Sequence, residues 1–155
     1  MAASTTKSLT AAKVQDLLNM SQEELDELYL NSPLGEIPVG DMRGTAIVMP
    51  RSSLGRIATS LIRLLVWQGK VFNPAQGDLK NKVSPFGYKS IKAKVYVGDS
   101  WKVKGQQAIV IDYSKTSFVA QKIRDEIRQV APGLYLGKVF WGRKHFLDFS
   151  LSLES

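Results

Sequence analysis

The sequence contains no cysteine and a single histidine, His145. Without cysteine the chain can form no disulfide, no thiolate metal site and no thiol nucleophile. One histidine cannot supply the two or three imidazoles that commonly hold a catalytic zinc ion. We therefore expect neither a metal nor a cofactor. The cysteine-free composition fits a reducing compartment, and we expect a cytoplasmic protein.

Long apolar runs are also missing, because no stretch approaches the roughly 20 residues that span a bilayer. Residues 1–13 lack the apolar segment of a secretory signal, but they are rich in Ser and Thr and precede the first acid, Asp16. That composition leaves a short organellar transit segment open as an alternative to a disordered tail. We expect residues 1–20 to form a disordered tail and residues 21–155 to form one soluble domain.

The charge is unevenly distributed along the 155 residues, whose formal net charge is +7. Residues 1–36 are acidic, so the rest of the chain carries an excess of positive charge above the overall value. A basic body of this kind attracts phosphates, anionic lipid surfaces or acidic ligands. Charge alone does not choose among these partners.

Capping and periodicity predict three helices. Ser21 and Glu24 match a capping box and predict a helix that ends before Pro33. Apolar residues at helical spacing predict a second helix from Ser52 or Ser53 to Val66. A narrow apolar stripe predicts a third, which starts after residue 116 or 117 and ends at residues 132–133.

Short alternating or apolar segments predict the strands. They cover residues 45–49, 70–72, 79–83, 91–97, 107–113, 134–141 and 145–153. Strands that follow one another with little helix between them favour a meander that closes on itself. The fold class is therefore α+β, an antiparallel, lipocalin-like (calycin) β-barrel, closed or partly open, with two to three helices. The main alternative is an open curved sheet with helices packed on one face.

Three parts of the sequence resemble one known family. They are residues 40–44 (Gly-Asp-Met-Arg-Gly), residues 67–72 (Trp-Gln-Gly-Lys-Val-Phe), and the set 111–113, 123–125 and 136–137. These segments are similar to small bacterial domains named for a Gly-X-Trp-X-Gly motif, with Met42 at the place of the tryptophan. The resemblance implies a lipocalin-like barrel that binds a small molecule.

The first candidate binding residues are Trp67 and Lys70, at the junction between the second predicted helix and a strand. Trp67 could line a ligand pocket, and Lys70 could bind a carboxylate or phosphate. The structural alternative makes Trp67 a core residue and Gly69 a site of backbone freedom. Tyr135 and Trp141, in the strand at residues 134–141, complete the predicted pocket lining.

Tyr113 and Arg124 are the pair most worth testing. Tyr113 ends an apolar strand, and Arg124 borders the apolar stripe of the third predicted helix, so both could reach a cavity and bind an acidic head group. The alternative places Arg124 in a solvated cluster with Asp125 and Arg128. His145 is a third catalytic candidate, but it lies three residues from Asp148 in a predicted strand, so the two side chains should face opposite ways.

Lysines with interleaved aromatic residues crowd residues 80–104. Such a segment could bind nucleic acid or an anionic membrane, or it could simply keep the outer face of a strand soluble. Arginine is absent from this segment, and no single-strand-binding motif accompanies it.

The sequence shows no nucleophile elbow and no phosphate-binding glycine loop. We therefore expect a binding or carrier protein for a small hydrophobic or amphipathic, anionic ligand in a barrel cavity. A cofactor-free isomerase, cyclase or lyase acting on such a ligand is the first alternative. A membrane-surface or nucleic-acid interaction module is the second.

Overall fold

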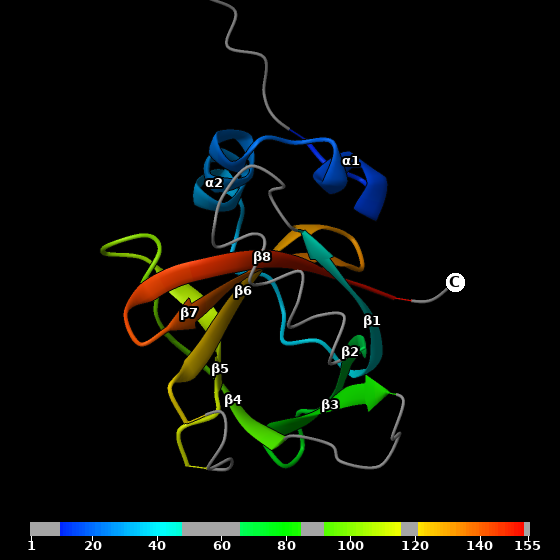
Figure 1. Cartoon of the computed structure of the whole chain (residues 1–155), viewed down its shortest axis with the longest axis vertical. Helices are drawn as coiled ribbons and strands as arrows, with labels where there is room; N and C mark the ends of the chain where they lie inside the picture. The colour runs from blue at the N-terminus through cyan, green and yellow to red at the C-terminus, as the bar shows by residue number, and fades with distance from the viewer. Residues whose placement is uncertain (1–9, 48–65, 85–91, 116–120, 154–155) are drawn as a thin grey trace, which may run out of the picture.

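The computed structural model describes residues 10–47, 66–84, 92–115 and 121–153. Eight antiparallel strands follow one another around a closed barrel, because β1 also pairs with β8 (Figure 1). Closure confirms the predicted barrel and rules out the open sheet. The strands are β1 (Gly40–Ile47), β2 (Val66–Asn73), β3 (Asp78–Ser84), β4 (Lys92–Asp99), β5 (Gln107–Asp112), β6 (Ile123–Ala131), β7 (Leu134–Trp141) and β8 (Lys144–Leu153).

Alternate residues of the strands point into the barrel and form its core. The core is apolar and includes aromatic side chains from several strands. Its buried members are Met42, Phe72, Leu79, Ala93, Val95, Ile109, Ile111, Tyr113, Ile127, Tyr135, Phe149 and Leu151. Strands β7 and β8 pair along almost their whole length.

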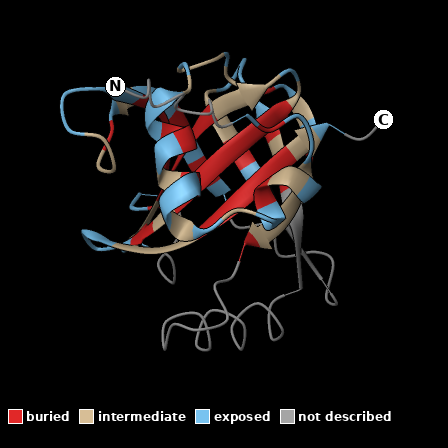
Figure 2. Cartoon of the chain, turned by 90° about the horizontal axis from the view of Figure 1, so that it is seen from above, coloured by how far each residue is buried: buried red, intermediate tan, exposed pale blue. Residues whose placement is uncertain are grey.

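Two helices, α1 (Val14–Leu18) and α2 (Gln22–Asn31), lie outside the barrel on the side of β8 (Figure 1). The predicted capping box at the start of α2 is confirmed, with Ser21 Oγ accepting from the Glu24 amide and the Glu24 carboxylate accepting from the Ser21 amide. Apolar residues of α2 pack against Leu134 and Leu136 on the outer face of β7. The strands beneath the helices are consequently buried along much of their length (Figure 2).

The helix predicted after residue 117 is wrong, since residues 123–131 form strand β6. Ile123 and Ile127 are four apart, a spacing that suits one face of a helix and also one face of a strand. Both faces of β6 are covered, so buried charged residues hide the alternation that marks a strand. The residues assigned to the end of that helix, Pro132 and Gly133, instead turn the chain from β6 into β7.

Three other expectations need adjustment. The first predicted strand starts at Gly40 in β1, five residues earlier than expected. The ordered chain also starts before residue 21, because α1 is helical and buries Leu17 completely. The helix predicted up to Val66 lies outside the described residues, except for Val66 itself, the first residue of β2. Neither helix in the described ranges is long and apolar enough to cross a membrane.

Candidate functional site

Three polar side chains meet inside the barrel, among the apolar core residues. Lys70 comes from β2, Tyr113 directly follows β5, and Asp125 comes from the middle of β6. Lys70 Nζ lies 3.1 Å from Asp125 Oδ2 and donates to the Tyr113 hydroxyl at 2.7 Å. The Tyr113 hydroxyl in turn donates to Asp125 Oδ2 at 3.3 Å. We call Lys70, Tyr113 and Asp125 the interior triad.

The strand registers explain why these residues meet. Lys70 is paired with Met42 of β1, and Asp125 is paired with Ile111 of β5, and both partners belong to the barrel core. Paired residues of neighbouring strands point to the same face, so Lys70 and Asp125 must also point inward. The interior triad is thus a direct product of the strand pairing.

Burial dominates the electrostatics of the interior triad, because the side chains of Lys70 and Asp125 are only 3% and 5% exposed. Loss of water raises the pKa of Asp125, and the neighbouring Lys70 charge only partly opposes this. The same loss of water lowers the pKa of Lys70, against the attraction of Asp125. Each group is therefore easier to neutralise than it would be in water. Perturbed groups of this kind are common at binding and catalytic sites.

One atom of the interior triad lacks a hydrogen bond. Asp125 Oδ1 is buried and has no hydrogen-bond partner in the described part of the chain, whereas Oδ2 accepts from both Lys70 and Tyr113. A buried carboxylate oxygen normally has a partner. This oxygen is the feature of the barrel interior that most directly indicates a missing ligand.

The structure brings together two of the predicted site residues, Lys70 and Tyr113. Tyr135 also belongs to the core, but its hydroxyl donates to the backbone oxygen of Glu36 at 2.6 Å rather than to the interior triad. Trp67 lies in β2, opposite Val83 of β3, and its side chain is outside the described residues. Trp141 is 52% exposed at the end of β7 and does not join the buried core. The predicted pocket lining is therefore only partly assembled.

Arg124 was predicted to point into a cavity, and this is wrong. In β6 it alternates with Asp125 and points outward, where its guanidinium group lies 4.0 Å from the centroid of the Trp101 ring. It also donates to the backbone oxygen of Asp99 and lies 3.9 Å from the Glu126 carboxylate. Arg124 therefore helps to fix the turn at residues 100–106 against the barrel.

The prediction that His145 and Asp148 face opposite ways is also wrong. A β-bulge in β8 pairs Phe140 with His145 and Val139 with Leu147, so Phe146 is an extra residue in the strand. The bulge turns His145 to the outer face, and its Nε2 lies 2.5 Å from Asp148 Oδ1.

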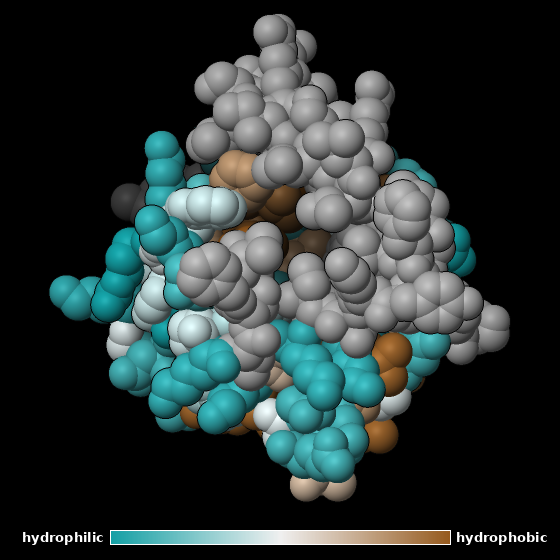
Figure 3. Space-filling model, turned by 60° about the horizontal axis from the view of Figure 1, so that its bottom comes forward, coloured by the Kyte–Doolittle hydropathy of each residue, from teal (hydrophilic) through white to brown (hydrophobic). Residues whose placement is uncertain are grey.

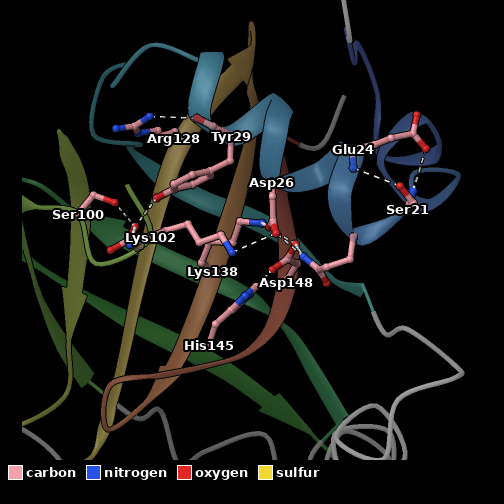
Figure 4. Close-up of polar contacts among 12 residues, drawn as sticks. Ser21, Glu24, Asp26, Tyr29, Ser100, Lys102, Arg128, Lys138, His145 and Asp148 are labelled. Carbon is pink, nitrogen blue, oxygen red and sulfur yellow. Dashed lines mark hydrogen bonds and ion pairs between the residues drawn. The ribbon is translucent and has the colours of Figure 1, made fainter. Parts of the chain in front are cut away.

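His145 and Asp148 belong to a polar network between α2 and the barrel, which is only partly buried (Figure 4). Lys138 Nζ is fully buried between the Asp26 and Asp148 carboxylates, at 2.6 Å and 2.7 Å. Burial opposes the ionisation of Asp148, but bonding to His145 and the Lys138 charge together hold its pKa below the usual value. We call Asp26, Lys138, His145 and Asp148 the outer network. It joins α2 to the barrel and has a structural role.

A second set of contacts also holds α2. The Tyr29 hydroxyl donates to Glu126 at 2.9 Å, and Arg128 donates to the backbone oxygens of Tyr29 and Gln107. These contacts place Arg128 in the buried interface of α2 and not in a solvated cluster with Arg124. Asp125, the third member of that predicted cluster, faces the barrel interior instead.

Asp125 is the site residue that the sequence reasoning missed as a ligand contact. A strand pattern would have identified Asp125, because in a strand it lies between Ile123 and Ile127 on the same inward face. Assignment of this segment to a helix placed it on a solvated surface. A strand assignment for residues 123–131 would have predicted a carboxylate inside the barrel.

Comparisons with known proteins add evidence on the fold. A scan against protein-family models found no match, and a search of curated proteins found none either. Among solved structures, the chain is similar to a crystal structure of a protein from Thermomonospora curvata, with a TM-score of 0.59. The two share 19% sequence identity, and the similarity covers 88% of this chain and 89% of the other. At this level of identity the likeness shows a shared fold and nothing about activity.

Proposed function

We propose that the protein is a lipocalin-like binding or carrier protein, which holds a small amphipathic ligand inside its barrel. An eight-stranded barrel is just wide enough to be filled by side chains or to hold one small ligand. Apolar walls with a few convergent polar groups are typical of sites for such ligands. The barrel core and the interior triad together have this composition.

The observation that carries the proposal is the buried interior triad with its unpartnered Asp125 oxygen. A charged pair that is removed from water loses hydration, and well-packed apolar residues often stabilise a core as well or better. The stability of the barrel alone thus gives a weak reason for Lys70 and Asp125 to be inside. Figure 3 adds support, since apolar side chains gather in a hollow near the centre of that view.

Binding inside the barrel can be tested with a neutral fluorescent probe, N-phenylnaphthylamine. Ala93 is fully buried in the barrel core, and Ala93→Leu adds volume there. We expect the wild-type protein to bind the probe and Ala93→Leu to weaken binding by about tenfold, since lost contact of about 1.4 kcal/mol has that effect. Fluorescence titration gives the affinity, and the melting temperature shows whether the variant stays folded.

The matched control is Lys94→Leu, which introduces the same side chain at the next, exposed position of β4. Its affinity for the probe should equal that of the wild type. Native mass spectrometry of freshly purified protein provides an independent check, because a retained small molecule would be seen directly. If the wild type binds no probe and retains no molecule, the carrier proposal is wrong.

A cofactor-free enzyme acting on the same kind of ligand is the second proposal, and the contacts of Tyr113 favour it. Its hydroxyl contacts both the Lys70 amine and the Asp125 carboxylate. Burial lowers the pKa of Lys70 and raises the pKa of Asp125. Such a hydroxyl could donate or accept a proton as a general acid or base. If so, Tyr113→Phe should reduce turnover by at least about a hundredfold while the affinity changes little. For a carrier, the same variant should change affinity alone.

A further inference from the structure

We propose that the ligand binds through a hydrogen-bond donor, specifically a hydroxyl group, that contacts Asp125 Oδ1. This inference rests on the proposed binding function and names the chemical class of the ligand's polar end. It makes the ligand an alcohol with an apolar body rather than a fatty acid or another carboxylate.

The hydrogen bonds of Asp125 point to a donor. Both donors of the interior triad, Lys70 Nζ and the Tyr113 hydroxyl, are directed at Oδ2. Oδ1 is buried without a partner in the described ranges. An ionised carboxylate oxygen can only accept a hydrogen bond, so the group that satisfies it must donate one.

The charge balance of the interior triad disfavours an anion. In the described part of the chain, Lys70 is the cation that pairs with Asp125, and its charge is already matched by that carboxylate at 3.1 Å. A carboxylate ligand at Oδ1 would place two negative charges side by side in a site with little water, which is costly. Arg124, which was expected to bind an acidic head group, points out of the barrel instead.

A hydroxyl also suits either protonation state of the site. Burial raises the pKa of Asp125, so its protonated form becomes more accessible than in water. A hydroxyl can donate to the carboxylate and can accept from the acid, whereas an ammonium group can only donate. The apolar body of the alcohol would lie against the core, where the Phe149 ring centroid is 5.4 Å from Lys70 Nζ.

The test compares three probes of similar length: decanol, its methyl ether and decanoate. Each is measured by displacement of bound N-phenylnaphthylamine at neutral pH. The ether keeps the apolar chain and the oxygen but has no donor. We expect decanol to bind at least about tenfold more tightly than the ether and decanoate, as expected for one buried hydrogen bond.

The variant Asp125→Asn should remove this preference. Because Lys70 and Tyr113 both donate, the amide oxygen takes the place of Oδ2 and the amide NH₂ group takes the place of Oδ1. The site then offers a hydrogen-bond donor beside Lys70, and the negative charge of Asp125 is gone. Decanoate should bind about tenfold more tightly than to the wild type. Decanol and its methyl ether can both accept from the amide, so their affinities should become equal.

The outcomes separate the two proposals. Wild-type binding of the ether or decanoate as tight as that of decanol would overturn the hydroxyl inference and leave the binding function standing. Failure of all three probes and of N-phenylnaphthylamine to bind would overturn both. If Asp125→Asn does not fold, the three wild-type affinities still decide the hydroxyl inference.

Discussion

Replacing Lys138 by methionine should destabilise the protein by about 3–5 kcal/mol, the usual cost of removing one partner from a buried ion pair. Lys138 Nζ is the shared partner of the Asp26 and Asp148 carboxylates, and Asp148 is completely buried. Methionine fills a similar volume but removes the cation that lies between the two carboxylates, so Asp148 keeps only His145 and Asp26 keeps only the partly exposed Lys102. Chemical denaturation of wild type and variant at neutral pH measures the difference.

The matched control is Lys102→Met, which also removes a lysine partner of Asp26. Lys102 lies 3.0 Å from Asp26, but its side chain is 23% exposed, so the loss should stay below about 1 kcal/mol. Without Lys138 the carboxylates should take up protons more readily, which favours the folded variant in acid. The difference in unfolding free energy between the wild type and Lys138→Met should therefore decrease as the pH falls toward about 4. A loss equal to that of Lys102→Met would show that the outer network does not hold α2 in the way described.

Replacing Gly137 by alanine should destabilise the barrel by about 3 kcal/mol, at the upper end of the usual cost of overpacking. Gly137 of β7 is paired with Phe149 of β8, and the Phe149 ring lies over it inside the barrel. A Cβ atom at residue 137 would lie 2.2 Å from Phe149 Cζ, far inside contact distance. The melting temperature and denaturation midpoint of the variant should both fall.

The cause can be isolated by a second change, Phe149→Leu. In the Gly137→Ala background the smaller leucine makes room for the new methyl group, so the double variant should lose less than the two single losses added together. A control in another strand is Gly98→Ala, whose added Cβ would meet its nearest atom at 3.1 Å. Additive losses in the double variant would mean that the Phe149 ring is not the obstacle.

The sequence predicted much of the fold because many of its elements have one covered face. The alternating strand at residues 91–97 and the capping box at Ser21 and Glu24 are local patterns, and both occur in the structure. The strand at residues 123–131 was not predicted, because this segment is covered on both sides, by the core and by α2. Its buried charges, such as Glu126 and Arg128, look like surface residues until their partners are known.

The candidate site was predictable only in part for the same reason. Lys70 and Tyr113 stand in segments correctly assigned to strands, or next to them, and they were identified as binding candidates. Asp125 was not identified as a binding candidate, because its segment was assigned to a helix. The contact between His145 and Asp148 depends on one extra residue in β8, and no periodicity rule locates such a bulge from one sequence. Both the position of Asp125 and the contact of His145 depend on how the strands pair, and one sequence does not show that pairing.

The contacts that hold α2 on the barrel have a consequence for local unfolding. The Lys138 and Glu126 side chains tie α2 to β7 and β6 from outside. Segments covered by many buried contacts open less often than segments with few. Opening of these two strands therefore requires release of α2, so the helix protects from outside the strand that carries Asp125 inside.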